Sequence, residues 1–212
     1  MGFTIGQLAR KVLGGKFWRV ARFYRSIFVN LERVADVVCE ELDDNASLLD
    51  VGGGDGELIN LILDRRPNTH VTMLDLKTEI GGSIHTKYWR NITLLPNTQL
   101  ATIEGQYDLV LLSDVVHHLP LRLRELFFRQ ALMVLRNNAR KLVIKDVEPI
   151  GMVSYLSYLS DFYISGDKDV SLISCSELID SIRAIDHRIV VHETRLILED
   201  HPNYCLVFRI DS

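Results

Sequence analysis

The chain has 212 residues, of which 47% are hydrophobic and 25% charged, as is typical of one folded domain of ordinary size. The formal net charge of −4 argues against a dedicated nucleic-acid-binding protein, because such proteins are usually basic. Its three cysteines lack C-x-x-C spacing and predict neither a zinc site nor disulfides, and no apolar run is long enough to span a bilayer. We therefore expect one domain over residues 1–212, located in the cytoplasm and binding no nucleic acid.

The first 31 residues carry six basic residues and no acidic one. Apolar residues between positions 17 and 34 share one face of a helical wheel, and the basic residues fall on the other. We expect an amphipathic helix that ends after Leu42, within a helical lid over residues 1–44. Two other roles stay open for this basic helix. It could guide an acidic or carrier-bound substrate, or it could contact an anionic membrane surface with the help of Trp18.

Strand patterns and helix patterns alternate through the rest of the chain, which predicts a parallel sheet covered on both faces. The expected fold is α/β, with a Rossmann-like core over residues 45–212. Its seven-stranded sheet should be mostly parallel, with helices on both faces and an antiparallel C-terminal strand. The predicted strands are 47–52, 70–76, 91–96, 107–114, 141–147, 188–198 and 203–210, and the predicted helices are 57–65, 121–136 and 176–185, the last opened by Ser174 and Glu177.

Four glycines follow the first predicted strand, in the stretch DVGGGDG that begins at Asp50. A strand, a glycine turn and a helix N-terminus form a backbone cradle for a ligand. The dinucleotide pattern G-x-G-x-x-G fails because Glu57 stands at its third glycine position, and no GK[ST] follows for a phosphate loop. The pattern that does fit is D-x-G-x-G-x-G. It resembles the first motif of class I S-adenosylmethionine-dependent methyltransferases, and its acid suits a ligand that carries an ammonium and a sulfonium.

Further motifs extend this resemblance over most of residues 48–149. Asp75 ends the second strand, where an acid of the family accepts hydrogen bonds from the ribose hydroxyls. YDLVLLSDVVHHLP and KLVIKDVEP resemble the family's fourth motif and its next strand, and the terminal antiparallel pair is the family's usual ending. The resemblance implies S-adenosyl-L-methionine as cofactor. The cofactor-binding residues that it implies are Asp50, Gly52, Gly53, Gly54, Gly56, Asp75, Leu76, Asn97, Ser113 and Asp114.

Several of these residues have a second interpretation. Asn97 stands where the family often has an acid near the adenine amine, but it is also an ordinary turn residue. Asp114 could line the methionyl or substrate end of the site, or it could cap the next helix. Asp146 and Glu148 end the fifth strand, where they could touch substrate or be loop carboxylates in water.

His117 aligns with the catalytic histidine of plant-type small-molecule O-methyltransferases, so the resemblance implies a base that takes a proton from a substrate hydroxyl. The expected substrate pocket comprises His118, Asp146, Tyr155, Tyr158 and Tyr163. We expect O-methylation of a small or medium-sized molecule in a secondary-metabolite or lipid-like biosynthetic pathway. The alternatives are N- or C-methylation, or a non-catalytic module that binds the cofactor or a partner. The sequence shows no cluster of metal ligands, so no metal is expected.

Overall fold

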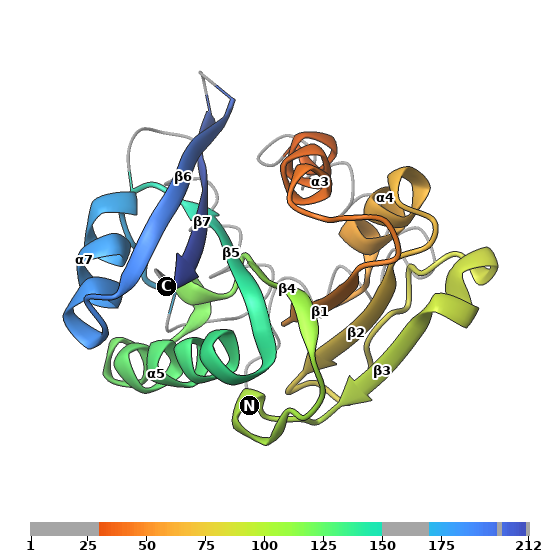
Figure 1. Cartoon of the computed structure of the whole chain (residues 1–212), viewed down its shortest axis with the longest axis horizontal. Helices are drawn as coiled ribbons and strands as arrows, with labels where there is room; N and C mark the ends of the chain where they lie inside the picture. Colours follow the sequence, from red (N-terminus) through yellow and green to blue (C-terminus); the bar gives the residue numbers. More distant parts are fainter. Residues whose placement is uncertain (1–29, 150–169, 199–200, 211–212) are drawn as a thin grey trace, which may run out of the picture.

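The computed structural model describes residues 30–149, 170–198 and 201–210, which form a sheet with helices on both of its faces (Figure 1). The basic segment before residue 30 and the three tyrosines of the expected substrate pocket lie outside these ranges. The α-helices and strands are α3 (Leu31–Glu40), β1 (Ser47–Val51), α4 (Glu57–Arg65), β2 (His70–Asp75), β3 (Ile92–Pro96), β4 (Tyr107–Ser113), α5 (Leu121–Asn138), β5 (Ala139–Val147), α7 (Cys175–Ile185), β6 (Ile189–Leu198) and β7 (His201–Ile210). Short 3₁₀ turns are η2 (Thr86–Asn91), η3 (Leu100–Thr102) and η4 (Val116–His118).

The seven strands lie in the order β3-β2-β1-β4-β5-β7-β6. The five strands from β3 to β5 pair in parallel, and β7 runs antiparallel to both of its neighbours. The predicted fold class is therefore confirmed. The strand order changes direction between β1 and β4, and in open α/β sheets ligands bind at this switch point, outside the carboxyl ends of the strands.

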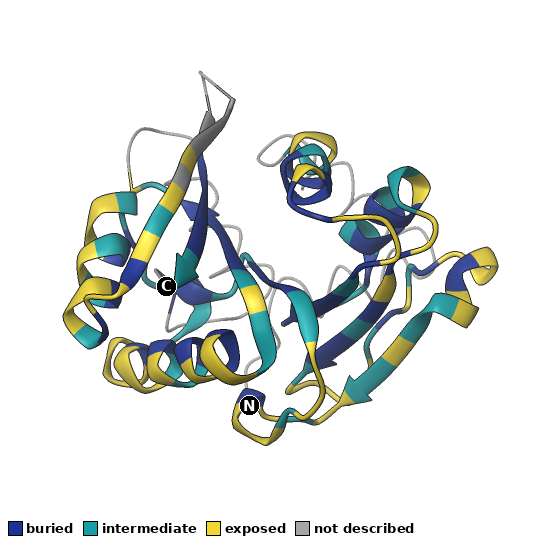
Figure 2. Cartoon of the chain, in the orientation of Figure 1, coloured by how far each residue is buried: buried dark blue, intermediate teal, exposed yellow. Residues whose placement is uncertain are grey.

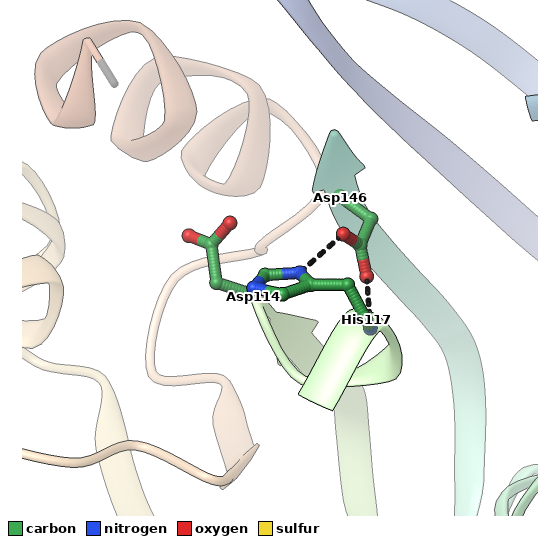
Figure 3. Close-up of side chains that lie close together, drawn as sticks. All are labelled: Asp114, His117 and Asp146. Atoms are coloured by element: carbon green, nitrogen blue, oxygen red, sulfur yellow. Dashed lines mark hydrogen bonds and ion pairs between the residues drawn. The ribbon is translucent and has the colours of Figure 1, made fainter. Parts of the chain in front are cut away.

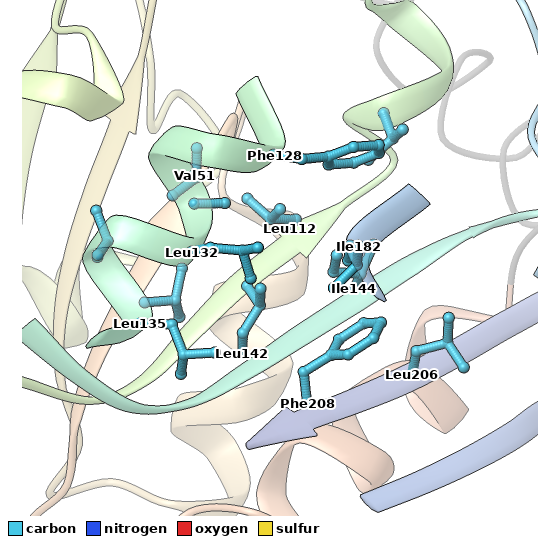
Figure 4. Packing of buried hydrophobic residues seen from close by; sticks show 14 of the residues in the cluster. Val51, Leu112, Phe128, Leu132, Leu135, Leu142, Ile144, Ile182, Leu206 and Phe208 are labelled. Carbon is cyan, nitrogen blue, oxygen red and sulfur yellow. The ribbon is translucent and has the colours of Figure 1, made fainter. Parts of the chain in front are cut away.

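Apolar residues from the two sheet faces pack into two separate layers. One layer joins α3 and α4 to the sheet, and the other joins α5 and α7 to it, where Phe128, Leu132 and Ile182 pack against Ile144 and Phe208 (Figure 4). Exposed residues gather on the outer faces of the helices (Figure 2). Because alternate residues of β5 point to opposite faces, Val143 belongs to the first layer and Ile144 to the second. The central strands β1 and β4 are thus buried over most of their length, and the candidate ligand-facing side chains lie at the strand ends.

Two local predictions have different outcomes. The expected cap of α7 is confirmed, because Ser174 Oγ accepts from the Glu177 amide at 3.2 Å and the Glu177 carboxylate accepts from the Ser174 amide at 3.0 Å. The expected continuous helix that ends after Leu42 is wrong at Asn30, which has the non-helical angles φ −86° and ψ 87°. Its side chain accepts from the Arg33 backbone amide at 3.1 Å and caps α3, which begins at Leu31. Within the described residues, none of the helices is long and apolar enough to cross a bilayer.

Candidate active site

The glycine turn between β1 and α4 has a backbone that few other residues adopt. Gly52, Gly54 and Gly56 all have positive φ angles. A Cβ atom added to Gly53 would lie 2.2 Å from Asp50 Oδ2, so the backbone passes directly over this carboxyl group. A Cβ added to Gly54 would meet no atom closer than 3.9 Å. The turn is therefore packed on the Asp50 side and open beside Gly54, where a ligand could lie against bare backbone.

Asp50 lies near the end of β1 and is only 3% exposed. Within the described parts of the chain, its carboxyl group has no hydrogen-bond donor. Burial, and to a smaller extent the nearby Asp75 carboxylate, raise the pKa of Asp50 to about 7. A buried acid of this kind is costly in its charged form, and a cationic ligand group beside it would offset that cost.

Asp75 stands at the end of β2, next to the same turn. Its Oδ2 accepts from the Gly54 amide at 3.2 Å and its Oδ1 accepts from the Lys77 amide at 2.9 Å. In this structure Asp75 therefore braces the glycine turn, a role that the sequence did not predict. Each carboxylate oxygen has a second lone pair, so this bracing leaves room for further donors.

Leu76 and Asn97 flank the strand ends beyond Asp75. Leu76 is 67% exposed, which is unusual for a leucine, and it lies beside the candidate ligand site. Asn97 has a φ of 51°, and its backbone amide donates to the Lys77 carbonyl at 2.9 Å. These features support the interpretation of Asn97 as a turn residue.

Ser113 ends β4, and Asp114 follows with a φ of 57°, in a left-handed conformation that costs a non-glycine residue energy. Lys145 of β5, whose side chain is completely buried, donates to Asp114 Oδ1 at 2.5 Å. The Asp114 amide in turn donates to the Lys145 carbonyl at 3.0 Å. Asp114 is thus held on both its backbone and its side chain by one residue of the neighbouring strand.

His117 and Asp146 form a buried pair at the ends of β4 and β5. The imidazole Nδ1 lies 2.6 Å from Asp146 Oδ1, and the His117 amide donates to Asp146 Oδ2 at 3.2 Å. The side chains are 4% and 0% exposed. Since an ionised carboxylate only accepts, this contact requires a proton on Nδ1, and in the neutral ring the unprotonated nitrogen is then Nε2. Figure 3 shows the imidazole between the side chains of Asp114 and Asp146.

The two halves of the candidate site are in contact. A Cβ added to Gly52 would lie 2.7 Å from Val115 Cγ2, so the glycine turn touches the segment that carries Asp114 and His117. The His118 ring lies against the His117 ring, with centroids 4.1 Å apart. Glu148 accepts from the Cys175 amide at 2.8 Å, which favours a role in fixing the start of α7 over a role in substrate contact.

Lys145 and Arg124 are the charged residues near this site that the sequence reading missed. Arg124 is 8% exposed and donates to the Ser171 carbonyl, while the Ser171 amide donates to the His117 carbonyl at 2.8 Å. Burial lowers the pKa of Arg124, and the Asp146 carboxylate opposes that shift. Lys145, within the apolar strand KLVIKDV, was the signal that could have predicted this network, because a buried lysine requires a charged partner.

Asp114, His117 and Asp146 offer ligand atoms within 4.8 Å of one another, a spacing also found at metal sites. Here Lys145 already supplies a positive charge to Asp114, and Asp146 accepts from His117 and from the Val147 amide at 2.8 Å. We therefore assign these side chains to an ionic network with its own cation and assign no metal to them.

Comparison with known proteins agrees with this geometry. A family model described as a methyltransferase domain matches residues 49–140, from β1 into β5. This match and the shared fold support the class I S-adenosylmethionine-dependent methyltransferase superfamily that the motifs resemble. The resemblance noted in its motifs is thus confirmed. No protein with a curated description matches the sequence.

Three solved structures illustrate the shared fold. The mitomycin 7-O-methyltransferase MmcR has a TM-score of 0.66 and 19% identity, over 85% of this chain and 54% of its own. Magnesium protoporphyrin IX methyltransferase (ChlM) from Synechocystis PCC 6803, with bound S-adenosylhomocysteine, has a TM-score of 0.66 and 16% identity, over 96% and 99%. The 1,6-didemethyltoxoflavin-N1-methyltransferase of Burkholderia thailandensis has a TM-score of 0.65 and 15% identity, over 100% and 93%. This chain spans about half the length of MmcR and most of the length of the other two.

Proposed function

We propose that the chain transfers a methyl group from S-adenosyl-L-methionine to a hydroxyl oxygen of a small or medium-sized molecule. The observation that carries this proposal is the buried His117–Asp146 pair at the strand ends beside the glycine turn. With a proton on Nδ1, the neutral imidazole would have its basic nitrogen at Nε2. An amine acceptor that is already neutral needs no such base, whereas a hydroxyl gains nucleophilicity when its proton is removed.

The residues of the glycine turn fit the cofactor. The space beside Gly54 accommodates a chain lying on the backbone. The first amide of α4, at Glu57, already donates to Asp55 Oδ1 at 3.3 Å, so the fit rests on the open backbone beside Gly54 and on the two acids Asp50 and Asp75. Asp50 would take the ammonium group, Asp75 the ribose hydroxyls and the exposed Leu76 one face of the adenine. When bound, S-adenosylmethionine supplies an activated methyl group on a positively charged sulfur.

The acceptor half supplies alignment and a base. The Nε2 atom of His117 would take the proton of the substrate hydroxyl as the hydroxyl oxygen receives the methyl group, and S-adenosylhomocysteine would leave as the carbon–sulfur bond breaks. Asp146 keeps the ring in the required tautomer and stabilises the imidazolium that forms, without itself taking the proton. Holding the oxygen in line with the methyl carbon, roughly 3 Å away, lowers the barrier by removing the entropy cost of their encounter.

N-methylation is the main alternative, and the N1-methyltransferase that spans this whole chain in the fold comparison favours it. A non-catalytic module is the alternative from a different class. The test is to incubate the protein with methyl-labelled S-adenosylmethionine and matched phenol, alcohol, carboxylic acid and amine acceptors. Transfer to oxygen that is lost in His117→Ala supports the proposal. Transfer to nitrogen that survives this substitution would favour N-methylation, and binding without any transfer would favour the module.

A further inference from the structure

The Lys145–Asp114 ion pair is unusual in its burial. The side chain of Lys145 is 0% exposed, while that of Asp114 is 32% exposed and faces the strand ends. An ammonium group buried this deeply in a sheet requires a strong partner, because the loss of water around it costs several kcal/mol. The pair lies 2.5 Å apart, with Asp114 in a strained backbone conformation. Such strain is found where the surrounding structure needs a side chain in one place.

The side chain of this strained Asp114 lies beside His117. Ligand atoms of Asp114, His117 and Asp146 lie within 4.8 Å of one another, so the imidazole lies between two carboxyl groups (Figure 3). Two negative charges at this distance would strongly favour the protonated imidazolium. A base that is already protonated cannot accept a proton from a substrate.

We propose that Lys145 is a positioning residue that compensates the charge of Asp114 and so keeps the His117 imidazole neutral and able to act as a base. The proposal deepens the proposed function and rests on it for its catalytic meaning. Asp146, which contacts Nδ1 directly, then remains the acid that orients the ring. Along the strand ends the four groups therefore follow one another in this order: the positive ammonium of Lys145, the negative Asp114, the neutral imidazole and the negative Asp146.

Among the described residues, charged and titratable groups surround the imidazole from several elements. They are Asp114 after β4, His118 in η4, Arg124 on α5, Lys145 and Asp146 on β5, and Tyr204 on β7, which pairs with Asp146 across the strands. Arg124 acts on Asp146, and its charge opposes protonation of His117 as Lys145 does. Lys145 differs from Arg124 in its direct contact with Asp114.

The chain offers a matched control on the same strand. Lys141 lies four residues before Lys145, on the same face of β5, and pairs with Glu41 at 3.0 Å. Its Cα lies about 13 Å along the strand from that of Lys145. Lys141→Met therefore removes a lysine charge and an ion pair from β5 without touching the network at His117.

The test is an NMR titration of the histidine ring nitrogens in the full-length protein, with His117 assigned through His117→Ala. In Lys145→Met the pKa of His117 should rise by about one to two units. Lys141→Met should leave it unchanged, and Asp114→Asn combined with Lys145→Met should bring it back toward the wild-type value. The exposed His70 serves as an internal reference. If Lys145→Met does not fold, Lys145→Gln removes the same charge and keeps a donor for Asp114.

An unchanged His117 pKa in a folded Lys145→Met or Lys145→Gln protein would overturn the proposal and leave the pair as a packing feature. A purely structural role also predicts no change in the pH profile. In our account, the acid limb of kcat/KM moves to higher pH by the same amount as the pKa, and activity recovers at high pH. If the NMR shift is found but no hydroxyl acceptor is methylated, the proposed function fails and the charge compensation stands. If methylation is found without the shift, only the inference fails.

Discussion

The two halves of the candidate site are built from different materials. The cofactor half, around β1 and β2, is mostly backbone, with positive φ angles at Gly52, Gly54 and Gly56. The acceptor half, at the ends of β4 and β5, is a network of side chains that includes Lys145 and His117. A backbone cradle can bind the methyl donor whatever the acceptor is. A side-chain network, in contrast, suits one kind of acceptor. Substitutions in the two halves should therefore separate cofactor binding from chemistry.

The largest separation is expected at His117. Removing a general base typically costs about 10²–10⁴-fold in rate, so His117→Ala should lower kcat by that factor. The dissociation constant of S-adenosylhomocysteine should stay within about twofold, because no cofactor contact is assigned to this residue. Steady-state kinetics on an identified acceptor and calorimetry on the same samples measure both effects. His70→Ala, at an exposed position on β2, is the control, and a loss of kcat as large as in His117→Ala would contradict the assignment.

Asp50→Asn should separate stability from binding. The folded-state pKa of about 7 is raised above the unfolded value of 3.8, so ionised Asp50 destabilises the fold above pH 7 and this penalty disappears as the pH falls toward 4. The shift corresponds to an upper limit of about 4 kcal/mol. Asp50→Asn should thus raise the unfolding free energy at pH 8 and change it much less at pH 5, as measured by urea denaturation.

The same carboxyl group should make cofactor binding depend on pH. In the wild type, S-adenosylhomocysteine should bind more weakly as the pH falls below about 7, because Asp50 loses the charge that its ammonium group needs. Asp50→Asn should bind weakly at every pH between 6 and 8. A variant that is destabilised at pH 8, or that keeps the wild-type pH dependence, would contradict the assignment of Asp50.

A substitution at Gly54, with Gly82 as the control position, tests whether a ligand lies on the open side of the turn. Gly54→Val should weaken binding of S-adenosylhomocysteine by at least about a hundredfold, or 2.7 kcal/mol, since its branches fill the ligand space. The positive φ should also cost on the order of 1–3 kcal/mol of stability. Gly82 has ordinary φ and no atom within 4 Å of an added Cβ, so Gly82→Ala should change neither quantity. Equal effects at both positions would show that no ligand lies at Gly54.

Asp75→Ala should give a smaller effect within the same half. Losing a charged acceptor costs on the order of 1.5–3 kcal/mol, which corresponds to roughly ten- to a hundredfold in affinity for S-adenosylhomocysteine. Part of this loss should come from the Gly54 amide, which Asp75 braces. Asp64→Ala is the control, because Asp64 lies on α4 and pairs with Lys87 of η2 at the surface, outside the candidate site. Wild-type affinity in folded Asp75→Ala would remove Asp75 from the site.

The difference between the halves also explains what the sequence could predict. The cofactor half was readable because a glycine turn needs particular residues at fixed spacing, and the α7 cap was readable because Ser174 and Glu177 are neighbours. The contact between Lys145 and Asp114 depends on the pairing of β4 with β5, which no local pattern encodes. The start of α3 after Asn30 was missed because the apolar period continues through this residue.

The most direct test of the whole account is calorimetric titration of the wild-type protein with S-adenosylhomocysteine, NAD and ATP at pH 8, where Asp50 is ionised. We predict saturable binding of S-adenosylhomocysteine with one site per chain and no measurable binding of NAD or ATP. Binding of either nucleotide, with none of S-adenosylhomocysteine, would contradict the central claim that the glycine turn and Asp75 form a cofactor site for methyl transfer.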